Sequence, residues 1–125
     1  MVERPVPEVL DQAALNELMA MVGDDAEFMD ELVDTYLNET PDLLAQIRSA
    51  LGNGSATEVV RPAHTLKGSS SSIGAREVEG LSRTIEEAAR ADAAEVLTLA
   101  DDLEDAYGRL VEALARARMR RWSGA

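Results

Sequence analysis

The chain has 125 residues, a length that suits one domain with one hydrophobic core. Its formal net charge of −12 argues against nucleic acid as the main partner and against an anionic membrane surface, because both need clustered Lys and Arg side chains. There is no cysteine, which excludes disulfides, thiol chemistry and zinc-finger spacing, and with only 3% aromatic residues an all-helical protein is expected.

The first ten residues contain two prolines and are expected to form an extended lead-in. Asp11 is a candidate N-cap for a short helix that ends at Gly23. Asp24 with Glu27 then resembles the capping box that starts a second helix.

The second helix is expected to reach about residue 51, where Asn53 and Gly54 end it. Pro41 lies within its apolar pattern, and a proline inside a helix kinks or ends it. The pattern favours one long kinked helix, with two shorter helices as the alternative.

Ser55 and Glu58 form a further capping box, which starts a third helix closed by Gly74. Pro62 lies inside this helix and should bend its first turns. Its inward stripe repeats at spacings of three and four, as in a bundle helix. The residues of this stripe are Val59, Ala63, Leu66, Ser70 and Ile73.

A fourth helix is expected from about Ala75 to Ala91, and a cap formed by Asp92 and Glu95 starts a fifth. Because the connections are short, neighbouring helices should be antiparallel. The pattern predicts an all-α, up-and-down antiparallel four-helix bundle with a short additional N-terminal helix. The boundaries are 1–10 for the lead-in, 11–118 for the bundle and 119–125 for a C-terminal tail.

One histidine and one lysine occur in the chain, and they lie three residues apart. A residue type used once cannot build a metal cluster, but it can be a single nucleophile with a cation beside it to hold an anion. Residues three and four apart share a helix face. The outward face through His64 therefore carries Arg61, Lys67, Gly68 and Ser71. Gly68 disfavours the helix by about 1 kcal/mol relative to alanine, and its missing side chain opens the approach to the imidazole.

The third and fourth helices should form an antiparallel hairpin with its turn near residue 75. Positions equally far from the turn lie at the same level, so Glu86 is expected level with His64, and Arg83 level with Lys67. A carboxylate that accepts a hydrogen bond from Nδ1–H would fix the tautomer and leave Nε2 as a free nucleophile.

The segment HTLKGSS at residues 64–70, followed by IGA at residues 73–75, strongly resembles the signature of histidine-containing phosphotransfer (Hpt) domains. The resemblance covers roughly residues 8–115. It implies that the histidine accepts a phosphoryl group from an aspartyl phosphate of a response-regulator receiver domain, and passes it to another receiver aspartate.

Carried over to this chain, the resemblance implies that His64 is phosphorylated on Nε2 and that Lys67 stabilises the phosphoryl group. Gly68 would leave room for the receiver, and Glu86 stands where the family often has Gln or Glu to bind Nδ1. Pro62 departs from the family pattern and could shift the entry to the site.

A docking surface for the receiver is expected around His64. The polar candidates on it are Gly68, Arg61, Ser71 and Arg83. The apolar candidates come from the first two helices, although the same residues could be core: Leu15, Met19 and Leu37.

The resemblance implies no cofactor of the chain's own, since a divalent metal, Mg²⁺, would be supplied by the acidic pocket of the receiver. The chain has no ATP-binding motif, so a phosphocarrier without autonomous kinase activity is expected. Its partners should be response-regulator receiver domains, a hybrid histidine kinase, or both, with no nucleic acid and no membrane. A monomer is expected.

No apolar run approaches the roughly 20 residues that span a bilayer, and the first residues lack a signal-peptide core. A cytoplasmic location is therefore expected, and the initial Met and short tails favour a free-standing protein. Two other functions remain open. One is a non-phosphorylated helical adaptor that binds a response regulator, and the other is the phosphoacceptor domain of a chemotaxis-type histidine kinase.

Overall fold

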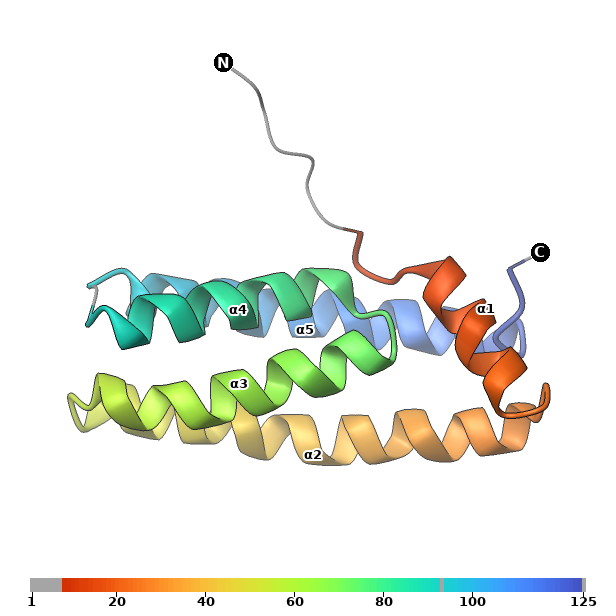
Figure 1. The fold of residues 1–125 in the computed structure, drawn as a ribbon, viewed down its shortest axis with the longest axis horizontal. Coiled ribbons are helices and arrows are strands. Elements are labelled where there is room, and N and C mark those ends of the chain that lie inside the picture. The colour runs from red at the N-terminus through yellow and green to blue at the C-terminus, as the bar shows by residue number, and fades with distance from the viewer. Residues whose placement is uncertain (1–7, 93, 125) are drawn as a thin grey trace, which may run out of the picture.

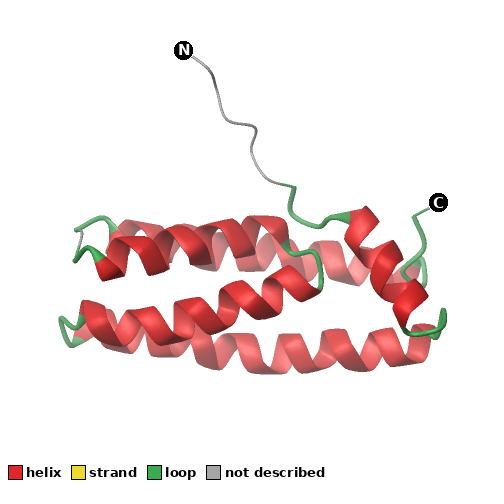
Figure 2. Cartoon of the chain, in the orientation of Figure 1, coloured by secondary structure: helices red, strands yellow, loops and turns green. Residues whose placement is uncertain are grey.

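The computed structural model describes residues 8–92 and 94–124. Within them the helices, in chain order, are α1 (Gln12–Met21), α2 (Ala26–Gly52), α3 (Ala56–Ser72), α4 (Arg76–Arg90) and α5 (Val96–Met119). The four long helices lie side by side, and α1 crosses one end of the bundle (Figure 1). Short loops join them, and this part of the chain contains no strand (Figure 2). The predicted fold class is confirmed.

The long helices form a closed ring of neighbours. α3 packs against α2 and, most extensively, against α4, while α5 packs against both α4 and α2. Because α3 and α4 are the most closely associated pair, side chains at the same level of these two helices come into contact. No helix in the described ranges is long and apolar enough to cross a membrane.

Two of the predicted N-caps are confirmed. The Asp11 carboxylate accepts hydrogen bonds from the backbone amides of Ala13 and Ala14, at 3.0 and 3.3 Å. Ser55 Oγ accepts one from the amide of Glu58 at 3.3 Å. Each side chain satisfies backbone donors that the first helical turn leaves unpaired.

The other two predicted caps were wrong. α2 is capped by Asp25, which accepts from the amide of Phe28 at 3.1 Å, whereas Asp24 lies in the connection with φ of +60°. A cap needs extended backbone, and of the two adjacent aspartates only Asp25 has it, with φ −83° and ψ +98°. α5 begins after Glu95 without a side-chain cap, and Asp92 has φ of +52°.

α2 continues through Pro41 as one helix, so the alternative of two shorter helices was wrong. Pro41 has no N–H to donate to the carbonyl of Leu37, one turn earlier. Tyr107 Oη donates to that carbonyl from α5, at 3.4 Å. A tertiary contact therefore compensates for the hydrogen bond that the proline removes.

The predicted inward stripe of α3 is confirmed, because all five of its residues are buried. In α4, Val78 and Ile85 are buried, while Leu81 and Ala88 are half-buried. The inward stripe of α3 fixes the rotation of the helix and leaves the face that carries His64 outside.

α1 is fastened to the turn between α3 and α4. The amide of Asp11 donates to the carbonyl of Gly74 at 2.8 Å, and Arg76 Nε donates to the Asp11 carboxylate at 3.1 Å. Gly74 has φ of +75°, and a Cβ there would lie 2.8 Å from the Cβ of Ala14. Only glycine allows this turn and this close approach.

The segment predicted as a C-terminal tail, 119–125, is partly inside the domain. Trp122 is 1% exposed, and its Nε1 donates to the Asp30 carboxylate on α2 at 2.9 Å. Gln12 Nε2 on α1 donates to the carbonyl of Trp122 at 3.2 Å. The bundle therefore extends beyond the predicted boundary at residue 118. Residues 1–7 of the predicted lead-in lie outside the described part of the chain.

Candidate functional site

His64 lies on the outward face of α3, and the helix α3 itself packs against α4. Its side chain is 63% exposed, although it stands on a rigid helix rather than a loop. Because the helix is held by its buried stripe, the imidazole is presented to solvent in a fixed direction.

The Glu86 carboxylate binds three side chains, and His64 is one of them. His64 Nδ1 lies 2.9 Å from Oε2, and Lys67 Nζ donates to Oε1 at 2.7 Å. Arg90 Nη2 donates to Oε2 at 2.8 Å. The Glu86 side chain is only 7% exposed, so two cations and a ring nitrogen surround a nearly buried anion. Hydrogen bonds from Lys67, then from Arg90, lower the pKa of Glu86 to about 2 against the opposing effect of burial.

An ionised carboxylate at this position decides which nitrogen of the ring carries the proton. Oε2 can only accept, so Nδ1 must be the protonated nitrogen of the neutral ring. The lone pair is then on Nε2, on the side of the ring away from Glu86. The chemistry that this allows is nucleophilic attack by Nε2 on an electrophile that approaches from solvent.

A model of the Hpt domain family matches residues 31–118, more than half of the chain. The chain belongs to the Hpt family. The match contains both α3 and α4, and with them every residue of the group around Glu86.

Relatives of the Hpt chain agree with this assignment. The chain is 29% identical over 84 residues to the phosphorelay intermediate protein YPD1 of Saccharomyces cerevisiae. The matched stretch covers 66% of this chain and 50% of the yeast protein. The chain therefore spans about half the length of the curated relative that it matches.

Two solved structures share the fold. The histidine-containing phosphotransfer protein B (HptB) of Pseudomonas aeruginosa PAO1 superposes with a TM-score of 0.81 at 26% identity, over 90% of this chain and 96% of that one. The Hpt domain of a sensor hybrid histidine kinase from Shewanella gives a TM-score of 0.62 at 20% identity, over 86% and 95% of the two chains. At that identity the second likeness shows the fold alone.

Lys67 of the Hpt chain forms an ion pair across the α3–α4 hairpin. Its ammonium is bound to Glu86 and its side chain is 27% exposed. Arg83, predicted level with Lys67, pairs with Glu79 on its own helix at 3.3 Å. Arg90 is the residue that sequence reasoning missed. It follows Glu86 by four positions, a spacing at which an acid and a base on one helix meet, so the i,i+4 rule could have found it.

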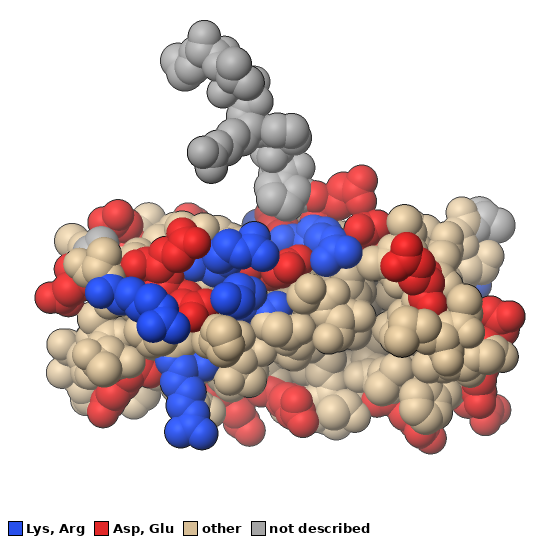
Figure 3. All heavy atoms as spheres, in the orientation of Figure 1, with Lys and Arg blue, Asp and Glu red and all other residues tan. Residues whose placement is uncertain are grey.

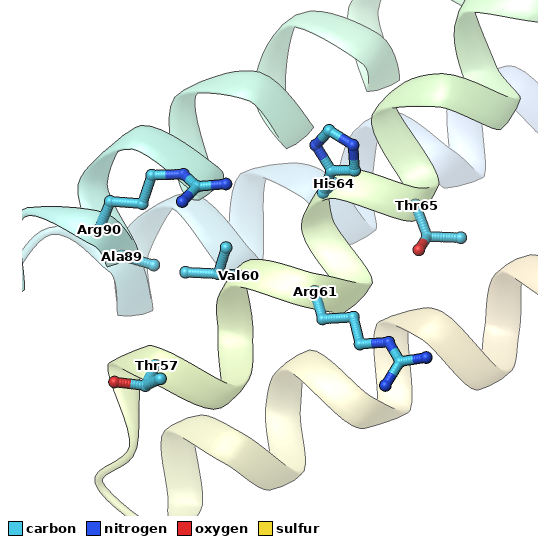
Figure 4. A pocket seen from close by; sticks show the side chains of 7 residues that line it. All are labelled: Thr57, Val60, Arg61, His64, Thr65, Ala89 and Arg90. Carbon is cyan, nitrogen blue, oxygen red and sulfur yellow. The ribbon is translucent and has the colours of Figure 1, made fainter.

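A cleft of about 700 Å³ opens beside His64 (Figure 4). It is lined by Thr57, Val60, Arg61, His64, Thr65, Ala89 and Arg90. Arg90 reaches from α4 into the space beside α3, while Arg61 extends away from the imidazole toward α2 (Figure 4). The side chains of Arg90 and Arg61 therefore point to different sides of the cleft.

Positive charge gathers on this face of a strongly acidic protein. Lys and Arg side chains cluster over α3 and α4 in the space-filling view (Figure 3). These helices carry Arg61, Lys67, Arg76, Arg83 and Arg90. Carboxylates of the same two helices lie among these cations and pair with several of them, so the charge around His64 is mixed rather than uniformly acidic.

Gly68 and Ser71 are exposed on the same face. A Cβ on Gly68 would meet no atom within 4 Å, so the packing of the chain itself does not require glycine there. The space beside position 68 is therefore open to solvent.

The apolar docking candidates fare differently. Leu15 is 0% exposed, so its prediction as a partner contact was wrong: it packs in the core. Met19 is half-buried, and Leu37 lines a cleft between α2 and α5 rather than the face of His64. A smaller cleft of about 240 Å³ on the α1, α2 and α3 side includes Leu18 and Leu32, which the sequence reasoning did not single out.

No group of three or more His, Asp or Glu side chains in the described ranges could hold a metal ion. The prediction that a divalent metal comes from the partner stays a prediction.

Proposed function

We propose that this Hpt protein carries a phosphoryl group on Nε2 of His64. It accepts the group from an aspartyl phosphate of one receiver domain and passes it to an aspartate of another. The observation that carries the proposal is the Glu86 carboxylate 2.9 Å from Nδ1 of an exposed imidazole, since this leaves Nε2 as the nucleophile.

The transfer step balances without a base on this chain. The Nε2 lone pair attacks phosphorus, the bond from phosphorus to the aspartyl oxygen breaks, and its electron pair returns to the carboxylate of the receiver. Nδ1–H stays on the ring, and Glu86 balances the positive charge that the ring gains. In the second transfer the ring departs as neutral imidazole with its proton still on Nδ1.

Lys67 supplies charge stabilisation in this proposal. It lies one turn from His64 and is bound to Oε1 of Glu86 at 2.7 Å. Phosphoryl transfer depends on positioning and on electrostatic stabilisation of the equatorial oxygens, so an ammonium one helical turn from the imidazole would favour the charged product. The divalent metal, Mg²⁺, belongs to the acidic pocket of the receiver.

The face around His64 is the proposed docking surface. Its cations complement the acidic pocket that a receiver presents, which favours encounter and orientation. Gly68 keeps the approach open, Ser71, Arg61 and Arg83 flank it, and the apolar cleft with Leu18 and Leu32 offers a contact on the α1 side. The cytoplasmic location and the monomeric state expected from sequence stay predictions.

The experiment is phosphotransfer profiling against the receiver domains of the source organism, at short times, with His64→Gln as the variant. We expect radiolabel to pass from at least one phosphorylated receiver to the wild type and not to the variant. Circular dichroism should give the same helical content and melting temperature for both proteins, because His64 is outside the core. Equal labelling of the variant would overturn the proposal.

Two further arms separate the alternatives. Receiver binding without transfer, across all candidates, would indicate the adaptor function. Labelling by a histidine kinase catalytic domain with ATP, and by no receiver, would indicate the phosphoacceptor domain of a chemotaxis-type kinase.

A further inference from the structure

The oxygen of Glu86 that faces His64 is held by a second residue, Arg90, at 2.8 Å. We propose that Arg90 is a positioning residue that acts through Glu86. It fixes Oε2 against Nδ1 and thereby keeps His64 in the tautomer whose Nε2 is free to take the phosphoryl group. The consequence for transfer rests on the proposed function, whereas the effect on the imidazole does not.

The two oxygens of the Glu86 carboxylate are bound by different cations, and these cations come from different helices. Lys67 of α3 holds Oε1, and Arg90 of α4 holds Oε2 together with the ring. The last torsion of a glutamate side chain is broad, so a carboxylate held at one oxygen can rotate. Without Arg90, the ammonium of Lys67 would be the remaining cationic partner, and Oε2 could turn away from Nδ1.

Burial raises the cost of leaving either oxygen of Glu86 without a donor. Glu86 is 7% exposed, and a nearly buried charge is stable only when it is paired and hydrogen-bonded. A glutamine at this position would be neutral and would need no counter-charge. The requirement for Arg90 should therefore depend on residue 86 being an acid, and this dependence can be measured.

The other arginines of α3 and α4 are engaged elsewhere. Arg76 binds Asp11 and Glu79, and Arg83 binds Glu79. Arg61 extends toward α2, away from the imidazole (Figure 4). Arg83 is thus a matched control for Arg90, since both are exposed α4 arginines in an i,i+4 pair with a glutamate.

The first experiment measures which tautomer of the His64 ring is present in the unphosphorylated protein. His64 is the sole histidine, so the ¹⁵N resonances of its two ring nitrogens are unambiguous. At about pH 8.5, well above the ordinary pKa of about 6.5 for an imidazole, they report which nitrogen carries the proton. We expect the Nδ1–H form in the wild type, a mixture of both tautomers in Arg90→Ala, partial recovery in Arg90→Lys, and no change in Arg83→Ala.

The second experiment is a double-mutant cycle on the rate of transfer from a receiver to His64. Arg90→Ala should slow transfer by about tenfold when residue 86 is Glu, and by less than about twofold in the Glu86→Gln background. An unchanged ring spectrum in Arg90→Ala would overturn the proposal. So would an equal loss of rate in both backgrounds, which would make Arg90 a direct contact of the receiver. If the wild type accepts no phosphoryl group, the proposed function fails while the ring spectrum still decides the role of Arg90.

Discussion

Two carboxylates at opposite regions of the molecule each bind a ring N–H and two cations. Glu86, between α3 and α4, has His64, Lys67 and Arg90 around it. Asp30 lies near the start of α2, beside the C-terminal segment of the chain. It accepts from Trp122 Nε1 at 2.9 Å and from Arg121 at 3.1 Å, and Arg118 lies 3.6 Å away. The inventories of donors are nearly the same.

The two rings differ in what remains once the hydrogen bond is made. Indole has a single N–H and no second nitrogen, and Trp122 is 1% exposed. Imidazole keeps a lone pair on Nε2, and the His64 side chain is 63% exposed. A charged cluster around a carboxylate is therefore not enough to mark a reactive site. The exposed second nitrogen is what gives the Glu86 cluster a chemistry, while the Asp30 cluster fastens the C-terminus to α2.

The largest expected effect is a loss of folding stability when the Asp30 cluster is disrupted. Trp122→Ala should destabilise the fold by about 3–5 kcal/mol, because it leaves a large cavity between α1, α2 and α5. Urea unfolding followed by circular dichroism measures this. Under conditions where the variant is folded, its rate of phosphoryl transfer should equal that of the wild type.

Trp122→Phe is the matched control, because it keeps an aromatic ring at this position and removes the donor to Asp30 together with the smaller ring of the indole. It should cost about 1 kcal/mol for the lost hydrogen bond plus a smaller cavity than Trp122→Ala leaves, and so less than that variant in total. If Trp122→Ala stayed folded and lost transfer, the two regions would not be independent and the contrast would be broken.

Lowering the pH should reduce the folding stability through Glu86, by less than Trp122→Ala does. The pKa of Glu86 falls from an ordinary value of 4.5 to about 2 in the folded protein. A folded-state pKa below the unfolded value means that its stabilisation is present above pH 4.5 and is lost as the pH falls toward about 2. Glu86→Gln should remove this part of the acid dependence, on the order of 1–2 kcal/mol between pH 4.5 and pH 2.

Free energies of unfolding in urea at a series of pH values measure that difference. Asp30 shares the direction: burial raises its pKa, but hydrogen bonds from Trp122 and Arg121 outweigh it and leave the pKa below the ordinary value. Acid loss of stability should therefore persist in part in Glu86→Gln. A variant with the full acid dependence of the wild type would contradict the proposed ionisation of Glu86.

Local periodicity explains why the sequence could predict one of these regions. The stripe of α3 fixes its rotation, and symmetry about the turn near residue 75 brought Glu86 level with His64, as the 2.9 Å contact bears out. Arg90 obeys an equally local rule and was missed because no motif drew attention to it.

The Asp30 cluster could not be derived in the same way. Trp122 meets Asp30 only after α5 has returned along α2, a contact across 92 positions of the chain that no local spacing encodes. Leu15 shows a second limit of sequence patterns, since an apolar residue on a short helix fits a core and a docking surface equally well. Its burial depends on how α1 crosses the bundle, which the close approach at Gly74 determines.

The smallest expected effect on folding stability comes from replacing exposed glycines. It separates the role of Gly68 in access to His64 from its effect on the stability of the helix. Gly68 on α3 and Gly108 on α5 are both exposed mid-helix glycines, and a Cβ on either would meet no atom within 4 Å. Alanine at each should stabilise its helix by up to about 1 kcal/mol, since glycine is the poorer helix former by that amount. Thermal unfolding should therefore show two similar, small gains. Transfer from a receiver should slow in Gly68→Ala and stay unchanged in Gly108→Ala, because only position 68 lies beside the imidazole. Equal transfer rates in the two variants would mean that the approach to His64 does not depend on the missing side chain, and the proposed role of Gly68 would have to be abandoned.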